Sequence, residues 1–373
     1  MSNTNVDLLY PEFWAASFDS LDMGEYQLQN LFSRQYESKM ANYGTSVDVP
    51  IQPDFGDATA WVPGGTITAS NTTQVIQQIK LDKSFRQTRT LNGTEMTKSK
   101  YDLIESWGIP AAKSIITTVN KEIYKEALSS PYWVDATANI TEDLVVEAGT
   151  KLSENEAGLD RKFVASPGVM GALMKVDAFQ HVDTTGSSDV MSQGIINRRM
   201  GFDFYRNNAI AKYTPADLVG AIDGDVDAGV SSFDVTGFDD DARPIRVGDI
   251  FTVAGNAQKY TVTATTVDTG GDTKSITFFP ALVADPASSA VITFVGTQSA
   301  LAFTPSAMAI AARPYATLPD GSGVMSMVTD VMGMPVRISV WHDGNLGLKF
   351  QYDVLFGVKM INSKRMVRVV EDI

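Results

Sequence analysis

The sequence predicts an α+β fold that is built around one long helix and carries an inserted all-β domain. Residues 98–128 hold the strongest helical pattern, and residues 223–297 hold only short β-rich runs between Gly, Asp and Thr turns. Residues 350–360 alternate apolar and polar side chains without a break, which is typical of a strand. At 373 residues, the chain is long enough for two or three domains.

The long helix is predicted from its first turn and its apolar stripe. Pro110 stands where a first turn tolerates proline, because that position needs no N–H donor. Ser129, Ser130 and Pro131 end the helix. The stripe consists of Ile109, Ala112, Ile116, Val119, Ile123 and Ala127.

The β-rich insert is also the most acidic part of the chain. The formal net charge is −14, and residues 221–300 contribute −7 through 11 Asp, no Glu and four Lys and Arg. Its β-rich runs are Phe233–Val235, Ile250–Val253, Tyr260–Ala264, Ile276–Phe279 and Val291–Val295. Their spacing predicts a small sandwich or barrel, and an inserted domain needs its two ends close together.

Two segments near the N-terminus allow two interpretations each. Residues 11–40 carry an apolar helical face formed by Leu21, Leu28, Phe32, Tyr36 and Met40. This face fits a core helix or an arm that packs on a neighbouring subunit. Residues 45–92 predict two extended runs around a long polar loop, which is either a surface loop or a hairpin ordered across another subunit.

Composition excludes several classes of function. The absence of cysteine excludes disulfides and thiol chemistry. The first residues lack the basic and apolar regions of a secretory signal, and no apolar run is long enough to span a membrane. The acidic balance does not favour electrostatic binding of nucleic acid, so DNA near this protein is expected to be confined and not gripped.

The sequence contains no recognisable catalytic or cofactor motif, so no enzyme activity and no cofactor are expected. His181 and His342 lack neighbours at metal-ligand spacing. Asp223, Asp225 and Asp227 superficially match the start of a calcium loop. Because Gly229 comes one position late and position twelve is Asp234, a solvated acidic linker is the default interpretation of this weak candidate.

Several residues are candidates for contacts between subunits. Asp239, Asp240 and Asp241 precede Arg243, and they form either a charged turn or an ionic contact with another copy. The remaining candidates lie in the polar loop and in the strand that returns from it. They are Phe55, Trp61, Arg86 and Arg89.

The order of these segments resembles the major capsid (coat) proteins of tailed bacteriophages, which share the Hong Kong 97-like fold. GTSVDVPIQ with QVIQQIKLDKSFRQTRTLNG looks like the extended loop of that family, and SKYDLIESWGIPAAKSIITTVNKEIYKEAL is similar to its spine helix. GVMGALMKVDAF, GIINRRMGFDFYRNNAI and LAFTPSAMAIAARP resemble its axial domain, and GMPVRISVWHDGNLGLKFQYDVLFGVKMINSKRMVRVV its closing segment. RVGDIFTVAGNAQKYTVTATT resembles the inserted β-barrel of the short-tailed Salmonella phage coat protein.

The resemblance implies a division of the chain into seven parts. These are an N-terminal arm (1–44), an extended loop hairpin (45–92), the spine helix and peripheral domain (93–135), the first part of an axial domain (136–222), the inserted β-barrel (223–297), the second part of the axial domain (298–345) and a C-terminal strand of the peripheral domain (346–373).

The implied function is a capsid subunit. Hexamers and pentamers of one chain would form an icosahedral shell around double-stranded DNA, without sequence-specific binding and without a membrane. A scaffolding protein and a portal protein are the implied partners, and a decoration protein is a further candidate. Assembly would occur in the host bacterial cytoplasm, and the mature location would be the virion capsid.

Two alternatives remain. The first is the shell of a non-viral, encapsulin-like nanocompartment with the same fold. The second is a carbohydrate-binding or hydrolytic protein with a β-module, in which Trp61, Trp107, Trp133 and Trp341 would have to form one platform. Trp107 starts a helix and Trp61 lies in a loop, so these residues give no coherent face.

Overall fold

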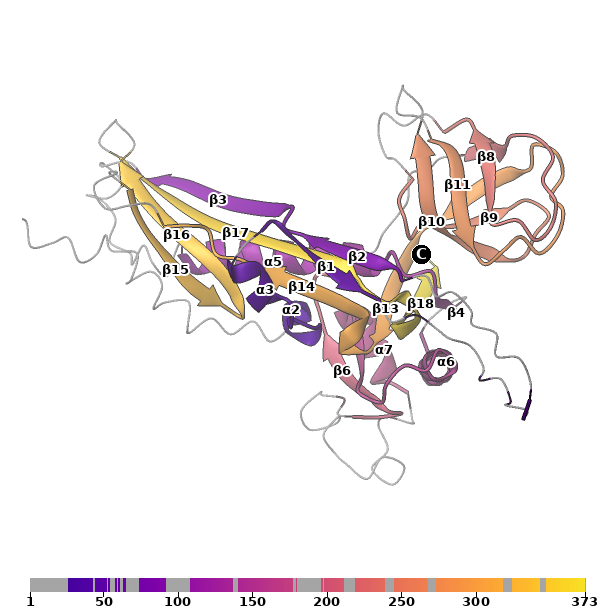
Figure 1. Ribbon diagram of the computed structural model, residues 1–373, viewed down its shortest axis with the longest axis horizontal. Coiled ribbons are helices and arrows are strands. Elements are labelled where there is room, and N and C mark those ends of the chain that lie inside the picture. Colours follow the sequence, from indigo (N-terminus) through magenta and orange to yellow (C-terminus); the bar gives the residue numbers. More distant parts are fainter. Residues whose placement is uncertain are drawn as a thin grey trace, which may run out of the picture.

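The protein consists of an elongated α/β body and a separate β-barrel at one end of it (Figure 1). The computed structural model describes residues 26–42, 44–51, 74–91, 108–136, 140–176, 198–210, 219–238, 245–267, 273–317, 324–342 and 347–372, with a few isolated residues between these ranges. Two five-stranded sheets form the body. The long helix α5 (Ile109–Ala127) packs against one of them.

Helix α5 confirms the prediction made from its first turn and its apolar stripe. Pro110 occupies the first turn, and Lys125 lies in the last turn, where a cation interacts favourably with the helix dipole. The predicted stripe is buried from Ala112 to Ala127, whereas Ile109 is half-buried. The sequence predicted that this helix begins before Ile109, but residues 92–107 lie outside the described residues.

The sheet beneath α5 is organised by one long strand, β17 (Leu348–Met360). Its even-numbered side chains from Phe350 to Met360 are buried on the side of α5, as the alternation in the sequence predicted. The other strands are β14 (Met308–Ala312), β15 (Val324–Val331), β16 (Met334–His342) and β3 (Lys83–Leu91). Strands β14, β16 and β3 all pair with β17 in antiparallel register, and β15 extends the sheet beyond β16.

The second sheet has the strand order β4–β18–β13–β5–β6. Its strands are β4 (Trp133–Ala136), β18 (Met366–Asp372), β13 (Thr297–Phe303), β5 (Arg161–Ala165) and β6 (Phe202–Arg206). Helix α6 (Glu142–Glu154) covers β4 and β18, and α7 (Pro167–Leu173) begins at the Ser166 cap. The short helices η3 (Pro305–Ala307) and η4 (Ser363–Arg365) connect the two sheets.

The insert is a closed six-stranded barrel, which decides between the two predicted architectures. Its strands are β7 (Val219–Ile222), β8 (Ser232–Thr236), β9 (Ile250–Val253), β10 (Lys259–Val267), β11 (Thr273–Phe279) and β12 (Val291–Val295). Every β-rich run predicted in the sequence lies in one of these strands. The sequence missed β7, which precedes residue 223. The first and last strands pair with each other, so the ends of the insert are adjacent.

The N-terminal helix predicted over residues 11–40 is wrong in its described part. Within residues 26–42, only α2 (Leu28–Leu31) and α3 (Glu37–Asn42) are helical, and the chain between them forms a bend, a β-bridge at Ser33 and a turn. The Ser33 amide donates to the carbonyl oxygens of Pro305 and Met308, and Ser33 forms a β-bridge with Ala309. These backbone bonds to another segment outweigh the local helical pattern. Leu28 and Phe32 are nevertheless buried, as the pattern indicated.

The predicted hairpin of residues 45–92 divides between two sheets. Strand β1 (Ser46–Pro50) pairs with β2 (Ile76–Lys80), but the chain then turns at residues 81–82 and β3 joins β17. Likewise, β16, which the sequence assigned to the axial part, pairs with β17 and carries β15 with it, and β18 of the C-terminal part pairs with β13. Strands from different predicted parts of the chain therefore pair in the same sheet.

A buried amide network joins α2, α5 and the end of β6. The Asn120 amide oxygen accepts from the Leu28 N–H at 3.0 Å and from the Asn207 side chain at 3.0 Å. Its amide nitrogen donates to Gln29 at 2.9 Å and to the Ile116 carbonyl at 2.8 Å. Both hydrogen-bonding atoms of this side chain are thus satisfied from several elements, which fixes how those elements pack.

Replacing Asn120 with alanine should lower the free energy of unfolding by about 2–4 kcal/mol, because a buried donor or acceptor that loses its partner costs about 1–3 kcal/mol. Ser114→Ala on the exposed side of the same helix is the control and should change little. Urea unfolding followed by circular dichroism measures both. Equal stability of the two variants would show that the network contributes nothing.

Candidate functional site

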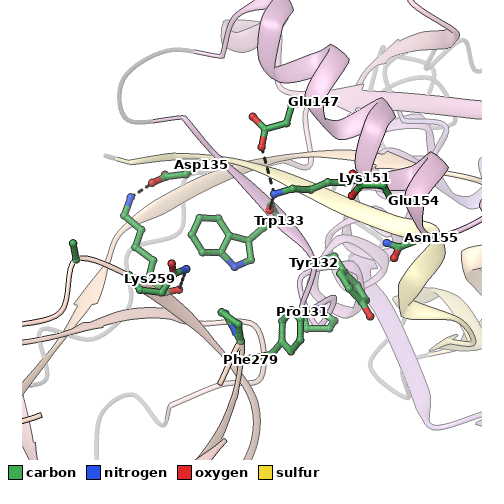
Figure 2. A pocket seen from close by; sticks show the side chains of 13 residues that line it. Pro131, Tyr132, Trp133, Asp135, Glu147, Lys151, Glu154, Asn155, Lys259 and Phe279 are labelled. Carbon is green, nitrogen blue, oxygen red and sulfur yellow. Dashed lines mark hydrogen bonds and ion pairs between the residues drawn. The ribbon is translucent and has the colours of Figure 1, made fainter. Parts of the chain in front are cut away.

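A cleft lies between the barrel and the second sheet (Figure 2). It has a volume of about 510 Å³, and Tyr132, Trp133 and Phe279 supply its aromatic surface. Lys259 of the barrel pairs with Asp135 at 2.8 Å. Lys151 of α6 pairs with Glu147 at 3.4 Å and donates to the Trp133 carbonyl at 2.8 Å. Of these contacts, the Lys259–Asp135 pair joins the barrel to the body, whereas the contacts of Lys151 lie within the body.

The cleft is lined by five charged side chains, Asp135, Glu147, Lys151, Glu154 and Lys259. Its lining includes no histidine, serine or threonine that could act as a base or a nucleophile. His342 lies at the end of β16 in the other sheet, and His181 lies outside the described residues. No described helix is both long enough and apolar enough to cross a bilayer.

The barrel docks on the C-terminal end of α5 through Gly248. This glycine has a φ of +98°, and a β-carbon built on it would lie 2.0 Å from the Leu128 carbonyl oxygen. Arg368 of β18 completes the junction from the other side. Its Nη1 donates to the Gly248 carbonyl at 2.8 Å, and its Nη2 donates to the Thr261 hydroxyl at 3.2 Å. Only a residue without a side chain fits between Leu128 and Arg368.

Burial controls the ionisation of the groups at this junction. The Arg368 side chain is only 1% exposed, and burial lowers its pKa to about 10 despite nearby Tyr124 and Asp249. Burial also raises the pKa of Tyr124 to about 12. The Tyr124 hydroxyl donates to the Ser299 carbonyl at 2.9 Å. Tyr124 is therefore a neutral hydrogen-bonding group near neutral pH.

The strand pair β1–β2 rests on β17 through a second close approach. A β-carbon on Gly357 would lie 2.0 Å from the Lys80 carbonyl oxygen at the end of β2. Beside this crossing, Val49 of β1 and Ile79 of β2 are buried against Ala309 and Ala311 of β14. The described ends of residues 45–92 are thus fixed on the body, at a place where the two backbones touch.

The sheet face that points away from α5 carries a row of charged side chains. In strand register, Arg86 of β3 stands beside Asp353 of β17, which stands beside Arg337 of β16. Asp353 is buried, and Arg337 binds it through Nη2 at 2.5 Å and Nε at 3.1 Å. Arg86 is exposed at the edge of this row. Arg89 is also exposed, but the alternation of the strand puts it on the opposite face.

The other candidate residues do not form a site in the described part of the chain. Asp223, Asp225 and Asp227 are exposed after β7, and the described residues contain no group of three acidic or histidine side chains that could hold a metal ion. The remaining candidates lie outside the described residues. They are Phe55, Trp61, Asp239, Asp240, Asp241 and Arg243.

Sequence reasoning missed the three residues that connect the parts of the fold. Gly357 interrupts an otherwise apolar and polar alternation, and a glycine inside a strand often marks a close backbone approach. Arg368 is the one charged residue in the run MVRVV, which is otherwise apolar. Gly248 carried the weakest signal, because Gly-Asp is common in ordinary turns.

Comparisons with known proteins find similarity in structure only. No family model and no curated protein matches the sequence. A chain of Mycobacterium phage Che8 matches with a TM-score of 0.55 at 13% identity, over 92% of this chain and 90% of its own. The capsid of Cyanophage P-SCSP1u matches with a TM-score of 0.50 at 11% identity, over 88% of this chain and 84% of its own. The capsid of a native GTA particle matches with a TM-score of 0.50 at 10% identity, over 94% of this chain and 92% of its own. The chain has the fold of phage capsid proteins.

Proposed function

We propose that this protein is the major capsid protein of a tailed phage, with the Hong Kong 97-like fold. Many copies would assemble into an icosahedral shell that encloses double-stranded DNA. The observation that carries the proposal is the match to phage capsid chains over at least 88% of this chain. Fold likeness alone does not fix function, so assembly has to be tested directly.

The mechanism that we propose is geometric. Residues 51–75 would extend from the base at Gly357 across a neighbouring subunit, with Phe55 and Trp61 in the contact. Arg86 would stand beside that contact, and Asp239, Asp240, Asp241 and Arg243 would form ionic contacts from the barrel. Each exposed ion pair contributes only about 0–1 kcal/mol, but a closed shell makes all of them at once.

The barrel would set the position of the body as well as contact its neighbours. It is joined to β4, β18 and α5 by Lys259, Arg368 and Gly248, so a displacement of the barrel would pull on the second sheet and on the end of α5. Partners from outside the chain would be a scaffolding protein, a portal protein and, as a further candidate, a decoration protein.

Negative-stain electron microscopy of the purified protein, alone and co-produced with its scaffolding protein, tests the proposal. Closed shells of uniform size in either sample are the expected result, and nuclease-protected double-stranded DNA should be recovered from mature particles. Shells that contain a cargo enzyme and no DNA would favour the nanocompartment alternative. A monodisperse monomer in both samples at concentrations well above micromolar would refute the proposal.

A further inference from the structure

The exposed side of α5 carries a concentrated positive charge on an acidic protein. Lys113, Lys121 and Lys125 are all exposed there, whereas the opposite side of the helix is buried against the sheet. We call these three residues the lysine stripe. A rise of 1.5 Å per residue places its ends about 18 Å apart along the helix axis. The whole chain has a net charge of −14, so this surface stands out from its background.

The acidic residues beside the stripe are already neutralised. Glu122 is 21% exposed and pairs with Lys83 of β3 at 3.1 Å and with Lys125 at 3.8 Å. Glu126 is 20% exposed and pairs with Lys359 of β17 at 3.2 Å. The two half-buried glutamates are therefore paired with Lys83, Lys125 and Lys359, and the exposed Lys113 and Lys121 add further positive charge to the same helix. Lysine side chains keep their charged ends in water, so the outer part of this surface is positive.

The chemistry of the surface fits an extended polyanion and not a folded partner. Between the lysines stand Ser114, Thr117 and Thr118, and the two threonine hydroxyls donate to carbonyl oxygens of their own helix. Protein interfaces usually have an apolar centre. The large exposed hydrophobic side chains lie elsewhere, for example Leu159 and Val283. A polymer with a uniformly negative backbone can bind through the lysine charges alone.

We propose that the lysine stripe contacts the phosphate backbone of double-stranded DNA, and that the α5 side of the subunit faces the enclosed DNA. The second half of this proposal rests on the proposed shell function. Each DNA strand has one phosphate per ~3.4 Å of axis, so a span of ~18 Å covers about five phosphates. The contact is weak in one subunit, because the rest of the chain is acidic, and it becomes effective when many copies line a closed surface.

The test compares the wild-type protein with a variant that carries Lys113→Gln, Lys121→Gln and Lys125→Gln. Glutamine and lysine have similar helix propensities, so α5 should persist, and circular dichroism checks this. The control carries Lys39→Gln, Lys175→Gln and Lys274→Gln. It loses the same charge from exposed positions outside α5.

The measurement is fluorescence anisotropy of a labelled duplex of about 20 base pairs over a series of salt concentrations. Each lost phosphate contact should reduce the slope of log Kobs against log salt by about 0.9, so the stripe variant should lose up to about 3. The control should keep the wild-type slope. Equal slopes in all three proteins, an equal loss in the control, or no measurable binding by the wild type would overturn the proposal.

Two further measurements distinguish this proposal from binding of an acidic polypeptide and from the proposed shell function. Polyglutamate replaces the duplex in the first arm. If the stripe variant loses polyglutamate binding but keeps the DNA slope, the partner is an acidic polypeptide and the DNA contact is refuted. The second arm is electron microscopy of all three proteins. Shells with unchanged DNA slopes refute only the stripe, whereas a lost slope without any shells refutes the shell function and leaves the DNA contact.

Discussion

Replacing Gly357 with alanine is expected to release the base of the extended loop from the long sheet. The new methyl group would stand 2.0 Å from the Lys80 carbonyl oxygen, which is backbone and cannot rotate away. Either β2 must lift from β17 or β17 must bend, and overpacking of this kind costs about 1–3 kcal/mol. Urea unfolding should show that loss, and the yield of closed shells should fall more steeply, because every copy carries the displaced loop.

The control for Gly357 is Gly158→Ala, because a β-carbon at Gly158 meets nothing within 4 Å. It should keep both stability and assembly. Hydrogen exchange provides a local readout: amides of β1 and β2 should exchange faster in Gly357→Ala, while those of the barrel stay protected. Wild-type assembly by Gly357→Ala would show that the loop base does not need its close contact with β17.

Gly248→Ala is expected to undock the barrel from α5. The substitution adds strain at a φ of +98° and places a methyl group 2.0 Å from the Leu128 carbonyl oxygen. Undocking would also remove the carbonyl that accepts from the buried Arg368. We expect a loss of roughly 3 kcal/mol or more, since backbone strain of about 1–2 kcal/mol adds to the overpacking cost.

Gly255→Ala separates these two contributions within the same barrel. Gly255 has a φ of +86° but no atom within 4 Å of its would-be β-carbon, so only the strain is added there. Calorimetry should show one cooperative transition for this control and a separate, earlier barrel transition for Gly248→Ala. Identical scans for the two variants would mean that the contact with Leu128 does not hold the barrel in place.

The sequence predicted best those elements whose pattern and packing agree. In α5, Pro110 and the stripe from Ala112 to Ala127 all point to the same buried helix. In β17, the alternation matches a sheet that has α5 on one face. The barrel runs were equally readable, because each strand carries its own apolar alternation and each turn its own Gly or Asp.

The prediction failed where the partner of a segment is distant in sequence. Residues 28–40 have a helical pattern, but Ser33 binds Pro305 and Met308, and the helix breaks there. The run 76–91 reads as one strand, but it divides at residues 81–82 between β1 and β17. Strand β7 offered only four residues, VGAI, and it is recognisable only through its pairing with β8 and β12.

The candidate contacts were harder to predict, because their role depends on what they meet. A charged residue such as Arg86 looks the same in sequence whether it stands beside a buried carboxylate or in open solvent. Only strand register brings it to the row of Asp353 and Arg337. For the same reason Arg368 could not be recognised as the link between barrel and body, since its acceptors are more than a hundred residues away.

The adjacency of β7 and β12 makes the barrel an exchangeable cassette. Ala221 stands opposite Val291, and Val219 stands opposite Thr293, so the chain leaves and re-enters the body through one strand pair. A foreign domain whose termini are equally close could be grafted at the same position without stretching either sheet. In the proposed shell, such a graft would occur once per subunit at a fixed spacing, which offers a route to ordered arrays of antigens or enzymes.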